Sequence, residues 1–333
     1  MSGLGRSGCS MRLGRDYTNC LVYDYLSDDE KRMVASGRID LVSMSAIVVK
    51  KAKMDVEREI ELTRKLGFSH VELDADVPSP YLDYDVQQKR AIRESAKSHD
   101  VTLSLHLPYS YISGSICCPQ ESDRTLAVEL HKRYIEFALG IGAKYLIMHP
   151  GNMPPYQTVG KYRDYACEAL IKSLVELGEL ASDRGLALHL ENNTAFQGIF
   201  FEVEECMAMV REARERGVDI YFNFDIGHWL TRADVGKPIP EPPESVLEPL
   251  PPDMLKELHL NDYLPGEHKF HPPLHLGLGF LKWGNLERYA RLVKRKNVEV
   301  VVVETAMQSV EQVLDRERIL SDESKYIKEA FGL

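Results

Sequence analysis

Near the end of the chain stands the stretch Val300-Val301-Val302-Val303-Glu304-Thr305. A run of four β-branched residues is typical of a strand in a parallel sheet that is buried on both faces. A carboxylate at the end of such a strand needs a partner, because an unpaired charge is costly away from water. The stretch therefore predicts a buried strand that ends at a functional group, Glu304.

The same pattern, an apolar run that ends on a side chain able to bind a metal, recurs earlier in the chain. The runs are Leu103–His106, Tyr145–His149, Leu186–Glu191, Ile220–Asp225 and Leu258–His259. Successive polar ends are 43, 42, 34, 34 and 45 residues apart, about the length that one strand, one helix and two loops require. This repetition predicts an α/β fold, a (β/α)8 TIM barrel whose strand ends surround a common point.

The start of the barrel has two readings. Asp40–Ile47 is the preferred first strand, because a helical pattern follows it directly from Asp55, and Met11–Gly14 is the alternative. With the preferred strand, residues 1–38 form an N-terminal extension that caps one end, and residues 39–333 form a single barrel domain.

Composition narrows the class of protein. The chain has 333 residues, 44% of them hydrophobic, and a net charge of -10, as expected of a soluble enzyme and not of a nucleic-acid binder. Six cysteines without metal-type spacing predict free thiols. The sequence has no secretory signal pattern and no run of about 18 apolar residues, so we expect a cytoplasmic protein without membrane contact.

Four of the strand ends carry a candidate metal site. Glu191, Asp225, His259 and Glu304 are predicted on neighbouring strands, and their three carboxylates repel one another unless they retain protons or share a cation. Three oxygen donors and one imidazole suit Mn²⁺, Mg²⁺ or Co²⁺ at least as well as Zn²⁺. The sequence therefore predicts a divalent metal.

The remaining histidines have open roles. His106 and His149 are either buried, hydrogen-bonded histidines or ligands of substrate or a second metal. His228 either reaches the same cavity or stacks on Trp229 in a loop. His189 is expected in the core.

The chain resembles the xylose-isomerase-like barrel superfamily, which joins sugar isomerases and epimerases to abasic-site nucleases of the endonuclease IV type. The resemblance covers about residues 40–325 and lies in the motifs HLPY, MHPG, HLENNT, FDIGHW, ELHLND, LGLGFLKW and VVVETA. It implies that Glu191, Asp225, His259 and Glu304 are the shared metal ligands. It also implies that Glu191 and Glu304 act as catalytic base and acid.

One motif departs from the nuclease branch. That branch has an Asp-x-His pair before its Leu-Gly-x-Gly run, which helps to hold a third zinc. This chain has His271-Pro272-Pro273-Leu274-His275, with Pro273 at the histidine position. A trinuclear zinc cluster is therefore not supported.

The predicted function is a metal-dependent isomerase or epimerase for a sugar or sugar phosphate, which moves a proton beside a carbonyl through an enediolate. Its predicted substrate contacts are His106, His149, His228 and His275. The alternatives are an abasic-site phosphodiesterase with two or three zincs and a sugar-binding barrel without turnover. A homo-oligomer would meet through residues 1–38 or the proline-rich segment 238–252, which is expected to be a rim loop.

Overall fold

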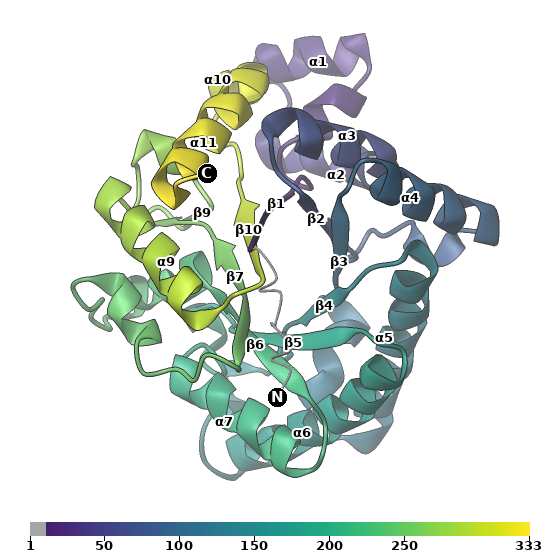
Figure 1. Ribbon diagram of the computed structural model, residues 1–333, viewed down its shortest axis with the longest axis vertical. Helices are drawn as coiled ribbons and strands as arrows, with labels where there is room; N and C mark the ends of the chain where they lie inside the picture. The colour runs from purple at the N-terminus through teal and green to yellow at the C-terminus, as the bar shows by residue number, and fades with distance from the viewer. Residues whose placement is uncertain (1–10) are drawn as a thin grey trace, which may run out of the picture.

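The computed structural model describes residues 11–333, which form a closed barrel of eight parallel strands (Figure 1). Around the barrel the order is β1-β2-β3-β4-β5-β6-β7-β10. Their bounds are β1 Arg12–Asp16, β2 His70–Asp74, β3 Thr102–His106, β4 Tyr145–Met148, β5 Ala187–Glu191, β6 Ile220–Asp225, β7 Leu255–Leu260 and β10 Val300–Glu304. The predicted (β/α)8 barrel is confirmed.

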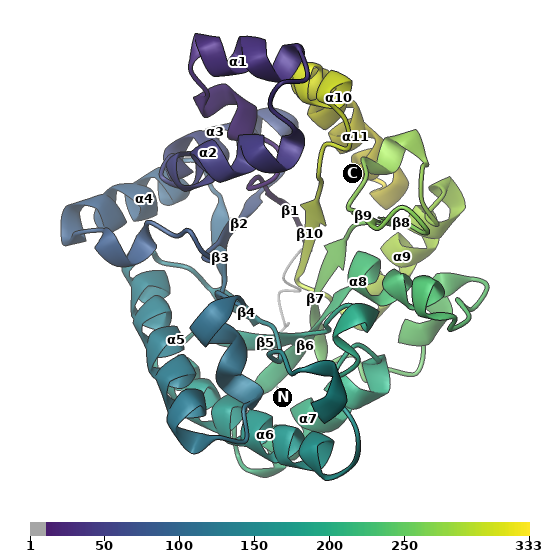
Figure 2. The same cartoon turned by 180° about the vertical axis from the view of Figure 1, so that it is seen from behind.

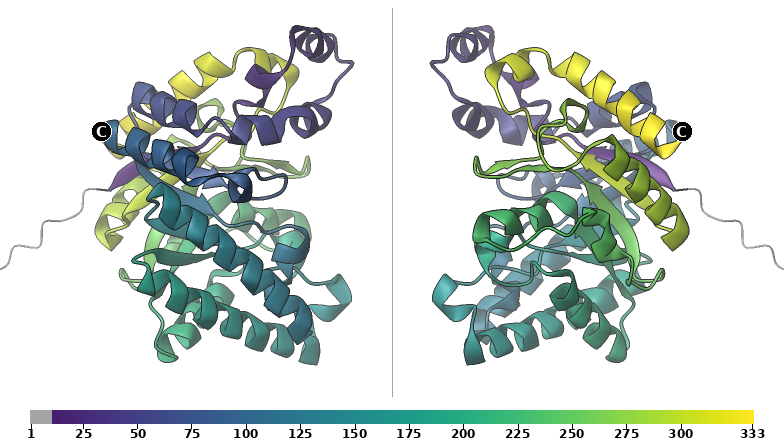
Figure 3. Two further views of the ribbon diagram at one scale, coloured as in Figure 1. Left: turned by 90° about the vertical axis from the view of Figure 1, so that its right-hand side faces the viewer. Right: turned by 90° about the vertical axis from the view of Figure 1, so that its left-hand side faces the viewer.

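Helices form the outer layer, as Figure 2 shows from behind and Figure 3 from the sides. They are α1 Asp28–Ala35, α2 Leu41–Lys53, α3 Val56–Leu66, α4 Val86–Ser98, α5 Glu121–Ile141, α6 Gly160–Asp183, α7 Val203–Glu215, α8 Ile226–Leu230, α9 Trp283–Lys296, α10 Val310–Leu314 and α11 Arg316–Phe331. Among residues 11–333, none of these helices is both long and apolar enough to cross a membrane.

The preferred first strand, Asp40–Ile47, is wrong, because this segment begins helix α2. Asp40 is the N-cap of α2, and its carboxylate accepts a hydrogen bond from the Ser43 backbone N–H at 2.7 Å. Met44 and Val48 are buried one helical turn apart, a period that a short apolar window does not reveal. The predicted N-terminal extension, residues 1–38, contains the true first strand, β1, close to the alternative start at Met11.

Strand β1 is buried although it has no hydrophobic run, because contacts with distant residues cover it. Gly14 lies so close to β2 that a Cβ there would be 2.7 Å from the His70 ring. Arg15 is fully buried and pairs with Glu323 of α11 at 2.9 Å. Pairing of β1 with β10 places Asp16 opposite Glu304 and closes the barrel.

The strands alternate between two environments. Val301 and Val303 belong to the large core between barrel and helices, whereas Val300 and Val302 pack in a small separate cluster with Tyr145 and Ile147. Because successive side chains point to opposite faces, the second cluster lies inside the barrel. The same inner face carries buried polar residues, including Glu72, Ser104, His189, Asn223, Glu257 and His259.

Two connections depart from a simple strand–helix repeat. After β7, the short hairpin of β8 (Tyr263–Leu264) and β9 (Lys269–Phe270) precedes α9. The segment 238–252 runs along α9 and does not form the predicted rim loop, since Glu244 contacts Arg288 and the Lys296 ammonium donates to the Leu250 carbonyl. It occupies the place of a helix between β6 and β7.

His131 makes the stability of the fold pH-dependent. It is buried in α5, with Nδ1 2.8 Å from the Ala127 carbonyl oxygen. Burial lowers the pKa of His131 from 6.5 to about 4, so the folded protein holds the ring neutral. The unfolded chain takes up that proton at higher pH, and stability is lost as the pH falls from 6.5 toward 4, by roughly 3 kcal/mol at most.

We expect His131→Asn, which keeps an N–H donor but does not titrate, to lose less stability than the wild type between pH 7 and pH 4. Urea unfolding at each pH measures this difference. Equal losses in the two proteins would contradict the role of His131.

Candidate active site

The four predicted metal ligands meet at the carboxyl ends of their strands. Glu191 ends β5, Asp225 ends β6, His259 lies near the end of β7, and Glu304 ends β10. The Nδ1 atom of His259 lies 3.5 Å from Glu191 Oε1, 3.6 Å from Asp225 Oδ2 and 3.4 Å from Glu304 Oε1. Glu191, Asp225 and His259 are fully buried. The strand register thus brings together side chains that are far apart in sequence.

These residues fit a divalent cation. Glu191 Oε1 and His259 Nδ1 are buried atoms without a hydrogen-bond partner among the described residues. Both atoms face the point where the carboxylates converge, and unpaired buried polar atoms are rare in folded proteins. The donor set of three carboxylates and one imidazole suits a hard divalent metal, with Zn²⁺ also possible.

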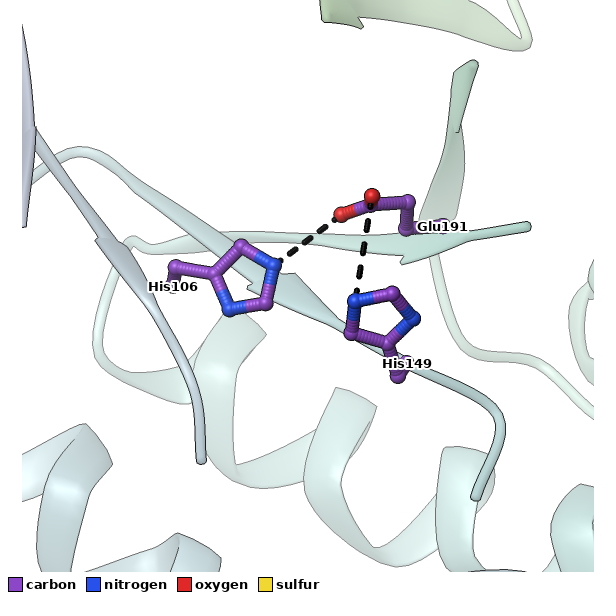
Figure 4. A group of neighbouring side chains, drawn as sticks. All are labelled: His106, His149 and Glu191. Atoms are coloured by element: carbon purple, nitrogen blue, oxygen red, sulfur yellow. Dashed lines mark hydrogen bonds and ion pairs between the residues drawn. The ribbon is translucent and has the colours of Figure 1, made fainter. Parts of the chain in front are cut away.

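The rings of His106 and His149 both point toward the Glu191 carboxylate, as Figure 4 shows. Nε2 of His106 is 3.1 Å from Glu191 Oε2, and Nε2 of His149 is 3.8 Å from Glu191 Oε1. Their ring centroids are 5.1 Å apart. Both predicted residues are therefore in the site, and one ligand atom from each lies within 4.8 Å of the others in the group His106, His149 and Glu191.

His228 also reaches the site, since its Nδ1 is 3.1 Å from Glu191 Oε1 and 3.7 Å from Asp225 Oδ2. His271, to which the sequence assigned no role, faces it with a ring-centroid distance of 5.6 Å. His271 Nδ1 lies 3.4 Å from Glu304 Oε2. Asp225, His228 and His271 form a further group whose ligand atoms lie within 4.8 Å of one another.

The prediction for His275 is corrected. His275 lies after Pro272 and Pro273, in the short 3-10 helix η8 (Leu274–Leu276). It does not line the site cavity. The charged groups that act on it are those of α11 and β1, with Glu323 the strongest. The two prolines follow His271 directly, and it is His271 that lines the cavity in the place predicted for His275.

Neighbouring charges set the ionisation of the site. Burial opposes ionisation of Glu191, but His259 and His149 outweigh it and hold the pKa of Glu191 well below its usual value. Burial raises the pKa of Glu304 well above its usual value, and Asp225 and Glu191 add to this effect while His259 opposes it. The two carboxylates predicted as base and acid therefore have opposite proton affinities.

The histidines of the site also differ in the direction of their pKa shifts. Burial lowers the pKa of His106 and His228, but nearby carboxylates outweigh it and raise these values to about 10 and about 9. Burial lowers the pKa of His149 and His271 to about 4 in each case. The site thus contains both proton-donating and neutral imidazoles around Glu191.

Two asparagines, to which the sequence assigned no role, hold residues of the candidate metal group. Asn261 Nδ2 donates to Asp225 Oδ2 and to Glu304 Oε2, each at 2.7 Å. Asn192 Oδ1 accepts from the Asp225 backbone N–H at 2.9 Å. Their signal in the sequence is weak: Asn192 directly follows the predicted run Leu186–Glu191, and Asn261 lies two residues after His259, inside the motifs HLENNT and ELHLND.

A cavity of about 580 Å³ opens beside Glu304, at the edge of the candidate metal group. His106, His149, His228, His271 and Glu304 line it. Asp16 and Asp74, at the ends of β1 and β2, line it as well. Burial and the neighbouring carboxylates Asp74 and Glu72 raise the pKa of Asp16 to about 7.

Known proteins are similar to this chain. The protein MJ1311 of Methanocaldococcus jannaschii is 28% identical over 141 residues, and the match spans 41% of this chain and 45% of MJ1311. The D-psicose 3-epimerase of Clostridium cellulolyticum H10, solved with D-tagatose, has a TM-score of 0.65 at 15% identity, covering 96% of this chain and 99% of that chain. The IolI protein, solved with a zinc atom, has a TM-score of 0.60 at 16% identity, covering 97% and 100%.

At these identities the solved structures establish a shared fold. The sequence model of the xylose isomerase-like TIM barrel family matches residues 39–330, which include seven of the eight barrel strands and all residues of the candidate metal group. The chain belongs to the xylose isomerase-like TIM barrel family.

Proposed function

We propose that this protein is a divalent-metal-dependent isomerase or epimerase for a sugar or a sugar-like hydroxy-carbonyl compound. The observation that supports this most strongly is the convergence of Glu191, Asp225 and Glu304 on His259 Nδ1, beneath a cavity of about 580 Å³. The epimerase and zinc-bound neighbours share this fold and agree with the proposal.

Glu191, Asp225, His259 and Glu304 would hold the metal, which would be Mn²⁺, Mg²⁺ or Co²⁺, or alternatively Zn²⁺. When bound, such an ion supplies Lewis-acid polarisation of a carbonyl and its neighbouring hydroxyl. Glu191, whose pKa is held low, is the base that removes a proton from the carbon beside the carbonyl. Glu304, whose pKa is raised, is the acid that returns one.

The histidines around Glu191 bind substrate hydroxyls in this proposal. His106, His149 and His228 line the cavity and carry ring nitrogens that can donate or accept hydrogen bonds. His271 takes the place first assigned to His275. These contacts would orient the carbon to be deprotonated toward Glu191.

We also propose that the substrate is unphosphorylated. Asp16 and Asp74 form one wall of the cavity, and within residues 11–333 its lining includes one lysine, Lys269, and no arginine. The Lys269 ammonium already pairs with Glu267 at 2.7 Å. A phosphate would meet the carboxyl oxygens of Asp16 and Asp74 at this wall, whereas such oxygens accept hydrogen bonds well from sugar hydroxyls.

A screen of ketoses, aldoses and hydroxy-keto acids, with and without phosphate, tests this proposal in the presence of Mn²⁺, Co²⁺ or Mg²⁺. We expect turnover of an unphosphorylated substrate and its loss after chelation of the metal. Binding without turnover across the panel would favour a sugar-binding barrel. Turnover of only the phosphorylated substrates would contradict the assignment of the Asp16–Asp74 wall.

A phosphodiesterase is the second candidate function. Two further groups, His106–His149–Glu191 and Asp225–His228–His271, each bring three ligand atoms within 4.8 Å, as a multinuclear metal site requires. Metal counting on the purified protein separates the candidates, because the isomerase needs one ion per chain and the nuclease two or three. A nicking assay on abasic duplex DNA completes the test.

A further inference from the structure

A buried carboxylate lies directly beneath the candidate metal group. Glu72, in the middle of β2, is 1% exposed and points into the barrel. Its Oε1 is 3.1 Å from Nε2 of His259, the ring nitrogen on the far side from Glu191, Asp225 and Glu304. Neither of these two atoms has a hydrogen-bond partner among the described residues. The ion pair between Glu72 Oε1 and His259 Nε2 is therefore the polar contact that these two atoms make within residues 11–333.

We propose that Glu72 is a positioning residue, which holds the imidazole of His259 so that Nδ1 faces the metal. The inference rests on the proposed metal site. A histidine that binds a metal through one ring nitrogen carries its proton on the other, and a carboxylate at that nitrogen fixes the tautomer and the ring orientation. Glu72 provides such a carboxylate from the opposite side of the barrel, two residues before the end of its strand.

Glu72 is itself fixed by a chain of buried hydrogen bonds. Its Oε2 accepts a hydrogen bond from the Ser104 hydroxyl at 2.9 Å, and Ser104 Oγ lies 2.9 Å from His70 Nε2. Because Ser104 uses its proton toward Glu72, it accepts the Nε2–H of His70. His70 Nδ1 then accepts from the Thr102 hydroxyl at 2.8 Å. The Oε2 atom of Glu72 is thus held by Ser104, and Glu72 cannot rotate away without breaking this hydrogen bond.

Glu257 offers a matched comparison inside the same barrel. It is fully buried two residues before His259 on β7, and neither of its carboxylate oxygens has a hydrogen-bond partner among the described residues. Its Oε2 lies 3.7 Å from Nδ1 of His189, whose pKa burial lowers to about 3, so this contact involves a neutral imidazole. Glu257→Gln therefore removes a buried carboxylate near His259 while it leaves the Glu72 contact in place.

Calorimetric titration with Mn²⁺ compares the wild type, Glu72→Gln and Glu257→Gln. We expect Glu72→Gln to weaken Mn²⁺ binding by about 10–100-fold, the usual effect of losing such a partner of a metal-bound histidine. Glu257→Gln should bind Mn²⁺ nearly as the wild type does. Unchanged affinity in Glu72→Gln overturns the proposal, and so does an equal loss in both variants, because the effect would then not be specific to the Glu72–His259 contact.

A spectroscopic readout tests the orientation itself. In the Co²⁺-loaded wild type, the Nε2–H of His259 should give a hyperfine-shifted proton signal that exchanges slowly with solvent. In Glu72→Gln this signal should shift and exchange faster, and an unaltered signal overturns the proposal. If Glu72→Gln does not fold, Ser104→Ala replaces it, since it removes the hydrogen bond that holds Glu72. Wild-type Mn²⁺ affinity in Ser104→Ala then overturns the proposal.

These outcomes also separate this inference from the proposed function. If the wild-type protein binds no divalent ion, both the proposed function and the role of Glu72 are wrong. A wild-type protein that binds one ion per chain, with Glu72→Gln unaffected, leaves the metal site in place and removes only the role of Glu72.

Discussion

Glu304→Gln is expected to lower turnover by about 10²–10⁴-fold, the usual contribution of a general acid or base. Glutamine matches the size of Glu304 but carries no exchangeable acid proton. It also replaces a carboxyl oxygen that lies 3.4 Å from His259 Nδ1, so metal binding should weaken as well. The measurement is kcat on a substrate found in the screen, at Mn²⁺ concentrations that saturate the variant.

Glu267→Gln is the matched control for this experiment. Glu267 is an exposed carboxylate between β8 and β9, near the cavity but absent from its lining. We expect this variant to keep wild-type kcat. If Glu304→Gln also kept wild-type kcat at saturating Mn²⁺, Glu304 would not be the acid, and the assignment of Glu191 as its counterpart would lose its basis.

Arg15→Met is expected to destabilise the fold by about 3–5 kcal/mol, because it leaves a buried carboxylate without its counter-charge. Arg15 and Glu323 are both fully buried and lie 2.9 Å apart. Glu323 Oε2 also accepts from the Thr305 hydroxyl, and Oε1 accepts from the Leu274 backbone N–H, each at 2.7 Å. The pair therefore joins β1 to α11 and to the loop that follows Glu304.

Arg12→Met provides the control on the same strand. Arg12 pairs with Asp100 at 3.5 Å, but the Asp100 side chain is 81% exposed, and water screens such a pair. The expected loss is about 1 kcal/mol or less. Urea unfolding of both variants decides the matter: similar midpoints for Arg12→Met and Arg15→Met would show that the buried pair does not close the barrel.

Most of the barrel could be predicted from sequence, because strands buried on both faces leave continuous apolar runs. Val300–Val303 are all fully buried, as their composition indicated. The rule that active-site groups of such barrels lie at the carboxyl ends of the strands then predicts that Glu191, Asp225, His259 and Glu304 lie together. His106 and His149 followed from the same rule.

Strand β1 escaped prediction because its burial depends on distant partners. The sequence Arg12-Leu13-Gly14-Arg15-Asp16 has one large apolar residue, and nothing nearby in sequence shows that Glu323 will neutralise Arg15. The sequence favours Asp40–Ile47 in its place because a helical pattern follows it directly, and its eight residues contain too few turns to separate a helical period from a strand. A local pattern cannot reveal an ion pair formed across 308 residues.

The sequence by itself determined the barrel and the four residues at its strand ends, since alternation and spacing along the chain are local quantities. The tertiary structure alone decided that His271 and not His275 enters the site, that Asn261 bridges Asp225 and Glu304, and that Glu72 lies beneath His259. The physical reason is that loop paths and the contacts across the barrel interior depend on the closure of the whole sheet. Strand register, once closed, brings these side chains within a few ångströms of one another.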